Sequence, residues 1–230
     1  MHKIVDNLAE VRGLIQDAAR NHKRDPQNVA LLAVSKTQTA EIIAEAYGSG
    51  QKTFGENYLQ EALDKIAALA HLDICWHFIG PIQSNKTRAI SENFAWVHTL
   101  DRLKIAQRLN AQRPECMIPL NVCIQVNIDD EPSKAGVAPT DLVPLAQRIA
   151  AMDKLHLRGL MAIPMHHDQH NSDNSAFMRM RKLFETLKAT GDFAHWDTLS
   201  MGMSDDFDDA IANGASIVRI GSAIFGARKK

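Results

Sequence analysis

Hydrophobic and polar positions repeat along the chain with two alternating periods. Residues 3–22 place apolar side chains three or four positions apart, which predicts an amphipathic helix at the start. Residues 29–34 form an unbroken apolar run, VALLAV, which ends in Ser35, Lys36 and Thr37. A short run rich in Val and Leu predicts a strand that is buried on both faces. From there the order repeats, with a short apolar run followed by a longer amphipathic segment.

This repeat predicts an α/β fold in which each strand is followed by a helix. The predicted strands are 29–35, 52–55, 74–79, 94–98, 120–126, 155–162, 195–199 and 216–220. The predicted helices are 40–47, 58–70, 84–92, 101–112, 142–152, 176–189 and 204–212, with a short turn at 222–225. We expect Thr39, Asp101 and Ser204 to cap the helices that they begin.

Strand–helix units of this kind indicate a parallel sheet with helices outside it. About eight units within 230 residues favour one domain, residues 1–230, folded as a closed (β/α)8 TIM-like barrel with an extra N-terminal helix. An open doubly wound sheet is the alternative. It is disfavoured because no glycine-rich fingerprint follows the first strand.

Composition excludes several classes of function. The chain has 26 Lys and Arg against 27 Asp and Glu, for a net charge of −1, so no basic field would attract nucleic acid or an anionic membrane. No apolar run reaches the length of a membrane span, and the N-terminus lacks the apolar core of a signal peptide. Three scattered cysteines without a CxxC pair indicate reduced thiols, and we expect a cytoplasmic protein.

Lys36 stands at the carboxyl end of the first predicted strand. Ligands of parallel-sheet proteins bind at that end of the strands. Apolar walls around a lysine stem disfavour the ammonium form, and the neutral amine can attack a carbonyl to form a Schiff base. The alternative is a lysine that extends to solvent and has no chemical role.

Two polar segments follow the last two predicted strands. Ser200 ends the seventh strand, and the acids after Ser204 are expected to face the positive end of a helix dipole rather than a metal ion. Gly221 and Ser222 follow the eighth strand and offer backbone N–H groups and a hydroxyl to an anion. The alternative for Gly221 is a glycine needed only for a tight turn.

A closed barrel would place these segments beside Lys36, because the eighth strand then neighbours the first. Barrel enzymes frequently bind phosphate after strands seven and eight. A small ligand with an aldehyde at one end and a phosphate at the other would span the two groups. Pyridoxal 5′-phosphate has this structure.

Six motifs in this sequence resemble one known family along nearly the whole chain. They are AVSKT at 33–37, FGENY at 54–58, WHFIGPIQSNK at 76–86, RGLMAI at 158–163, LSMGMSDDFDDAI at 199–211 and VRIGSAIFG at 218–226. They resemble the pyridoxal phosphate homeostasis proteins, also called the YggS or PROSC family. The resemblance implies a barrel like the N-terminal domain of alanine racemase, with pyridoxal 5′-phosphate held as an internal aldimine on Lys36.

The same resemblance implies roles for further residues. Ser200, Gly221 and Ser222 would hold the phosphate, and many relatives have threonine where Ser222 stands. Arg219 would face the pyridine nitrogen, where a permanent cation disfavours the pyridinium form and weakens the ring as an electron sink. Asn57 would lie near the ring hydroxyl. His77 and Met203 would line the site, although a packing role is an alternative for each.

We therefore expect a binding protein that buffers and delivers pyridoxal 5′-phosphate, with effects on amino-acid and keto-acid balance. Its partners would be the cofactor and recipient apo-enzymes. The sequence ends at Lys230, so we expect no second β-domain of the kind that supplies racemases with another base and a dimer interface, and we expect a monomer. The alternative is a weak amino-acid racemase that uses Lys36 as its base.

Two further features stay open at this level. His166, His167, Asp168 and His170 form a cluster that is read as a solvated loop, with a metal site as the alternative. No metal is predicted. Lys134 is a candidate for a second contact with the cofactor, and a solvated loop lysine is the alternative.

Overall fold

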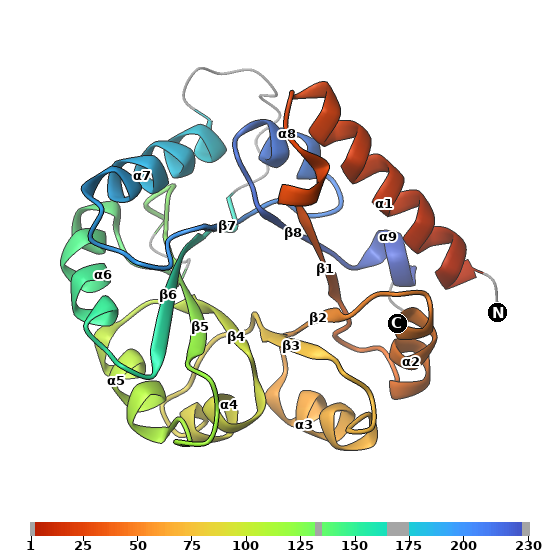
Figure 1. Cartoon of the computed structure of the whole chain (residues 1–230), viewed down its shortest axis with the longest axis horizontal. Helices are drawn as coiled ribbons and strands as arrows, with labels where there is room; N and C mark the ends of the chain where they lie inside the picture. The colour runs from red at the N-terminus through yellow and green to blue at the C-terminus, as the bar shows by residue number, and fades with distance from the viewer. Residues whose placement is uncertain (1–2, 132–134, 165–174, 227–230) are drawn as a thin grey trace.

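The predicted barrel is confirmed by a computed structural model, which describes residues 3–131, 135–164 and 175–226. Eight parallel strands pair in chain order and close on themselves (Figure 1). The strands are β1 (Ala30–Val34), β2 (Thr53–Glu56), β3 (Cys75–Phe78), β4 (Trp96–Leu100), β5 (Leu120–Gln125), β6 (Leu155–Met161), β7 (Thr198–Ser200) and β8 (Ile217–Ile220).

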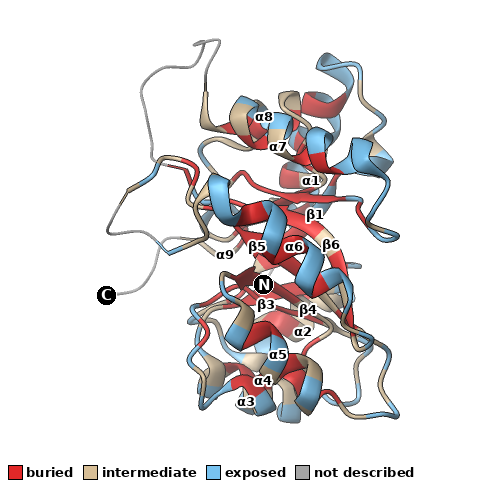
Figure 2. Ribbon diagram, turned by 90° about the vertical axis from the view of Figure 1, so that its left-hand side faces the viewer, coloured by how far each residue is buried: buried red, intermediate tan, exposed pale blue. Residues whose placement is uncertain are grey.

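Helices surround this barrel. They are α1 (Lys3–Asn21), α2 (Ala40–Gly48), α3 (Leu59–Ala68), α4 (Thr87–Asn93), α5 (Leu103–Gln112), α6 (Leu142–Ala150), α7 (Ala176–Thr190), α8 (Phe207–Ala212) and α9 (Ser222–Phe225), with 3-10 turns at Pro26–Asn28 and Pro139–Asp141. Figure 2 shows buried strands inside helices whose outer faces are exposed. Each helix buries its apolar stripe against the sheet, as its amphipathic pattern predicts.

Pairing of β1 with β8 closes the barrel. Leu31 pairs with Val218 and Leu32 with Arg219, so the ends of the two strands lie side by side. Helix α1 packs across α8 and α9 near this closure. Asn7 Nδ2 donates a hydrogen bond of 2.7 Å to the carbonyl of Ile224, which ties α9 to α1. The leading helix therefore holds the chain segment that follows β8 in place.

The first strand is less buried than its sequence suggests. Leu32 and Ala33 are fully buried, whereas Ala30 at the start of β1 is exposed. The prediction of a strand buried on both faces therefore holds for Leu32 and Ala33, whereas Val34 at the carboxyl end is partly buried and lines the cavity.

Two predicted helix starts are wrong. Arg102, rather than Asp101, is the N-cap of α5, and Asp101 instead pairs with Arg102 across 3.2 Å. Helix α8 begins at Phe207 with Asp206 as its N-cap, so Ser204 lies outside the helix. The carboxylate of Asp206 accepts the Met203 N–H at 2.5 Å, and this contact stabilises a turn where the sequence pattern continues the helix.

Strand β7 is also shifted from its predicted range of 195–199. It pairs with β6 from Thr198 onward, opposite Gly159. Among the described residues, no helix is long and apolar enough to cross a membrane.

A glycine at the end of β3 allows a close approach of two backbone segments. A Cβ atom on Gly80 would lie 2.0 Å from the carbonyl oxygen of Asn57. Because that oxygen belongs to the backbone and cannot move aside as a flexible side chain would, Gly80→Ala is expected to lower the free energy of unfolding by about 3 kcal/mol. Urea denaturation measures this loss.

The matched control is Gly13→Ala in α1, where an added Cβ would meet nothing within 4 Å. Helix propensity predicts a gain of up to about 1 kcal/mol at this position. Equal unfolding midpoints for the two variants would contradict the close approach at Gly80.

Candidate functional site

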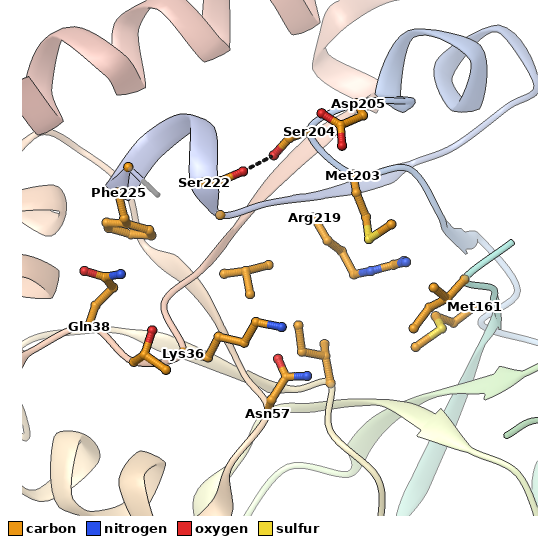
Figure 3. Close-up of a pocket in the computed structure, with 16 residues that line it drawn as sticks. Lys36, Gln38, Asn57, Met161, Met203, Ser204, Asp205, Arg219, Ser222 and Phe225 are labelled. Atoms are coloured by element: carbon orange, nitrogen blue, oxygen red, sulfur yellow. Dashed lines mark hydrogen bonds between the residues drawn. The ribbon is translucent and has the colours of Figure 1, made fainter. Parts of the chain in front are cut away.

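A cavity of about 260 Å³ opens at the carboxyl ends of the strands, next to the closure of the barrel. Its walls come from the ends of β1 and β8 and from the loops after β2 and β7 (Figure 3). Six of the eight residues predicted from the sequence line it: Lys36, Asn57, Met203, Arg219, Gly221 and Ser222. The expectation that these segments meet in one place is therefore confirmed.

Lys36 extends from the end of β1 into this cavity, with its amine beside the Asn57 side chain (Figure 3). Val34 and Ile79 contribute apolar surface to the same wall. The Asn57 Oδ1 atom is buried, and the described part of the chain supplies no hydrogen-bond partner for it. A buried acceptor without a partner is costly, so this atom is available to a ligand donor.

Two hydroxyls lie across the cavity from Asn57. Ser222 at the start of α9 donates a hydrogen bond of 3.3 Å from its Oγ to that of Ser204 (Figure 3). Gly221 is the N-cap of α9 and has no side chain to bind the first N–H groups of this helix. Gly221 lets β8 approach β1 closely, since a Cβ there would lie 3.1 Å from the Val34 carbonyl oxygen. Paired hydroxyls at the entrance to a helix can donate to an anion.

Ser204 was missed as a site residue because its position before two acids resembles a helix cap. Its hydroxyl is directed to Ser222 instead of to a helix N–H. Its position in the sequence could have identified it, because Ser204 directly follows Met203, a predicted site residue, among the residues after β7. His98 was not singled out either, and no local motif marks it.

Arg219 is buried and held by two hydrogen bonds. Its guanidinium donates from Nη1 to Ser200 Oγ and from Nη2 to the carbonyl of Ala162, each at 2.9 Å. Burial lowers the pKa of Arg219 to about 10, which still leaves the side chain charged at neutral pH. The site therefore presents a fixed cation with donors and no acceptor.

A chain of hydrogen bonds continues from Arg219 into the barrel. Ser200 Oγ accepts from the arginine and is hydrogen-bonded to His98 Nδ1 at 2.8 Å. His98 Nε2 is hydrogen-bonded in turn to His77 Nδ1 at 2.9 Å, and one of these two nitrogens carries the proton. The remaining nitrogen of His77, Nε2, lies 3.5 Å from Cys75 Sγ.

His77 and Ser200 belong to this chain of hydrogen bonds and do not lie where the sequence predicted them, in the lining of the cavity. Both are buried inside the barrel, and neither lines the cavity. His77 stacks on Trp96, with ring centroids 5.2 Å apart. Ser200 lies behind Arg219, with protein partners on both sides of its hydroxyl.

The remaining candidates are outside the described residues. Lys134, His166, His167, Asp168 and His170 all fall there. Within 3–131, 135–164 and 175–226, no group of three or more His, Cys, Asp or Glu side chains could hold a metal ion.

The donor set fits a flat aromatic aldehyde that carries a phosphate. An amine can attack the aldehyde, two hydroxyls can bind phosphate, and a fixed cation can face a neutral ring nitrogen. The unpartnered Asn57 oxygen can accept a hydrogen bond from a ring hydroxyl. The residues present therefore fit pyridoxal 5′-phosphate.

The buried histidine pair predicts how stability depends on pH. Burial lowers the pKa of His77 to about 3, and burial with nearby His77 and Arg219 lowers the pKa of His98 well below its usual range. Unfolding exposes both rings, which then take up protons below about pH 6.5. Their contribution to stability is complete above that pH and is lost as pH falls from 6.5 toward 3.

For His77 the loss at pH 5 is about 2 kcal/mol, from 1.4 kcal/mol per pH unit. Urea denaturation at pH 7.5 and pH 5 measures this loss. The difference in the free energy of unfolding between the two pH values should be smaller by this amount in His77→Asn. His71→Asn, at an exposed histidine, is the control and should retain the parent difference. An unchanged difference in His77→Asn would contradict a buried neutral pair.

Comparison with known proteins identifies the family of this chain. The sequence profile of the family described as "Alanine racemase, N-terminal domain" matches residues 7–229. The pyridoxal phosphate homeostasis protein of Pseudomonas aeruginosa is 55% identical over 228 residues, which cover 99% of this chain and 97% of that one. The protein of the same name from Escherichia coli K12 is 51% identical over 231 residues, covering 99% and 98%.

Solved structures show the same fold. PipY of Synechococcus elongatus, in a structure described as having PLP bound, superposes with a TM-score of 0.84 at 35% identity, covering 97% of this chain and 100% of that one. Alanine racemase of Corynebacterium glutamicum superposes with a TM-score of 0.71 at 15% identity and shares the fold alone, with 97% and 62% covered. By sequence and by fold, the chain belongs to the pyridoxal phosphate homeostasis proteins.

Proposed function

We propose that this protein binds pyridoxal 5′-phosphate covalently through Lys36 and serves as an intracellular carrier in vitamin B6 homeostasis. The observation that carries the proposal is the cavity itself. One amine, one buried guanidinium and a pair of hydroxyls face the same space of about 260 Å³. The names of the relatives and the PLP-bound PipY structure support the same ligand.

Each lining residue has a distinct role in this proposal. The cofactor supplies an electrophilic aldehyde on an electron-withdrawing ring. Lys36 forms the covalent bond, and Asn57 accepts a hydrogen bond beside it. Ser222 and the backbone at Gly221 bind the phosphate. Met203 covers the ring as an apolar wall.

Ser204 replaces Ser200 as the second phosphate hydroxyl in this proposal. Ser204 lines the cavity and lies 3.3 Å from the hydroxyl of Ser222. Ser200 is fully buried, and its hydroxyl is already engaged by Arg219 and His98. We infer that Ser200 supports the site by orienting Arg219.

Arg219 favours binding over turnover. A charged guanidinium opposite the pyridine nitrogen keeps that nitrogen unprotonated, which weakens the ring as an electron sink. The weak racemase alternative is not favoured, because the racemase neighbours share 11–18% identity with this chain and the likeness shows the fold alone.

We further propose that the carrier delivers its cofactor to apo-enzymes, in the cytoplasm and as a monomer. Among the described residues, the exposed large hydrophobic side chains are spread over α1, α6, α7 and several loops instead of forming one patch. Light scattering on the purified protein should give a mass near 25.5 kDa. A mass near twice that value would contradict the monomer.

The covalent bond can be tested directly. Added pyridoxal 5′-phosphate should produce a new visible absorption band, and borohydride should fix a pyridoxyl group on the peptide that contains Lys36. Lys36→Ala should lose both signals, because the alanine side chain has no amine. Mass mapping of the reduced protein measures the attachment site.

Lys52→Ala is the matched control, because Lys52 is an exposed lysine that lies next to β2 at the opposite end of the barrel. It should load like the parent. A band that survives in Lys36→Ala, with the label on another lysine, would overturn the assignment.

Delivery can be separated from catalysis in one assay. Loaded protein, freed of excess cofactor, should restore activity to the apo form of a pyridoxal-phosphate-dependent aminotransferase. The same loaded protein should leave L-alanine unchanged when D-alanine is measured by chiral chromatography. Steady formation of D-alanine that disappears in Lys36→Ala would favour the racemase instead.

A further inference from the structure

A cluster of three charged side chains, two of them buried and the third, Glu61, 31% exposed, lies directly behind the loop that carries Lys36. The ammonium of Lys65, on α3, is 2.8 Å from Glu56 Oε1 and 2.5 Å from Glu61 Oε1. The side chain of Glu56 is fully buried, and that of Lys65 is only 6% exposed. None of the three lines the cavity.

The cluster fixes the residue before Lys36. Lys65 Nζ donates to the carbonyl oxygen of Ser35 at 2.8 Å. The hydroxyl of Ser35 donates to Glu56 Oε1 at 2.6 Å. The carbonyl oxygen and the hydroxyl of Ser35 are therefore both hydrogen-bonded to the Lys65–Glu56 ion pair.

The cluster also fixes the residue after Lys36. The backbone N–H of Thr37 donates to Glu61 Oε1 at 2.6 Å, the oxygen that Lys65 also contacts. Ser35 and Thr37 are thus tied to one charged unit, with the Lys36 backbone between them. This leaves little freedom for the direction in which Lys36 leaves the end of β1.

Thr37 has a backbone conformation that needs such support. Its φ of 65° lies in the left-handed region, which is disfavoured for a β-branched residue. Strained backbone persists only where the surroundings determine it, and it concentrates at functional sites. The Glu61 contact supplies this constraint one residue from the amine.

Stabilisation of the folded state is by itself a weak explanation for the presence of this cluster. Burial raises the pKa of Glu56, although the hydrogen bonds from Lys65 and Ser35 oppose this shift. Apolar side chains of similar volume often stabilise a protein as well as a buried ion pair does. What apolar side chains would lack here is hydrogen bonding to the backbone on both sides of Lys36.

We propose that Glu61 and Lys65 are positioning residues that aim the Lys36 amine into the cavity. This inference rests on the proposed role of Lys36 as the attachment point of the cofactor. Neither residue touches the cavity, so their effect is exerted through the backbone of Ser35 and Thr37.

The test compares two substitutions at one position. Glu61→Gln keeps an oxygen that can accept the Thr37 N–H, whereas Glu61→Ala removes it. Timed borohydride trapping after addition of pyridoxal 5′-phosphate measures the rate of attachment at Lys36. Attachment should be about 10- to 100-fold slower in Glu61→Ala, because small misplacement of a reacting group costs this much. Glu61→Gln should stay within about threefold of the parent.

Lys65→Met should be slowed like Glu61→Ala. Its matched control is Arg113→Met, which removes another buried cation that donates to three backbone carbonyls, those of Ser91, Phe94 and Ile118, at the opposite end of the barrel. This control should lose stability but attach the cofactor at the parent rate. Equal slowing in Arg113→Met would overturn the positioning role.

Amide hydrogen exchange without cofactor gives an independent readout. The Thr37 amide should be protected in the parent and in Glu61→Gln, and exposed in Glu61→Ala. Protection that is the same in all three would overturn the inference. If the parent attaches no cofactor at Lys36, the proposed function fails, and the exchange of Thr37 still decides whether the cluster orders this loop.

Discussion

The parallel pairing of β1 with β8 is the constraint on which the site depends. Ala33 pairs with Ile220, so Lys36 and Gly221 leave neighbouring strands at the same edge of the barrel. Lys36 and Gly221, which are 185 positions apart in the sequence, thereby face one cavity. Barrel closure removes the free sheet edges. It also fixes the distance between the ends of β1 and β8, since neighbouring strands lie about 4.8 Å apart. An open sheet of the same elements would separate the amine from the hydroxyls.

Two polar networks then orient the groups that the barrel brings together. The Lys65 cluster holds the backbone around Lys36. The chain from His77 through His98 and Ser200 holds Arg219. The histidine chain and the Lys65–Glu56 pair are buried, where hydrogen bonds are strong and unmet partners are costly. Each network supports the cavity wall from behind through hydrogen bonds, and most of its members leave the cavity to the ligand.

The fold and most of the site could be predicted from the sequence. Lys36, Gly221 and Ser222 follow strands whose apolar runs are plain, and parallel strands always end at the same edge. Ser200 and His77 could not be placed, because whether a strand-end side chain faces the cavity or the barrel interior depends on register and tilt. The prediction that Ser204 caps α8 was wrong because the hydrogen bond from the Met203 N–H to Asp206, rather than local helix propensity, decides where α8 begins. His98 gains its meaning only from partners distant in sequence.

The central claim is that one cavity holds the cofactor by its aldehyde, its ring and its phosphate. A crystal structure of the protein loaded with pyridoxal 5′-phosphate tests this most directly. We predict continuous density from Lys36 Nζ, a ring nitrogen within hydrogen-bond distance of Arg219, and a phosphate between Ser204 and Ser222. Cofactor bound through another lysine, or a phosphate that displaces His98 from Ser200, would contradict it.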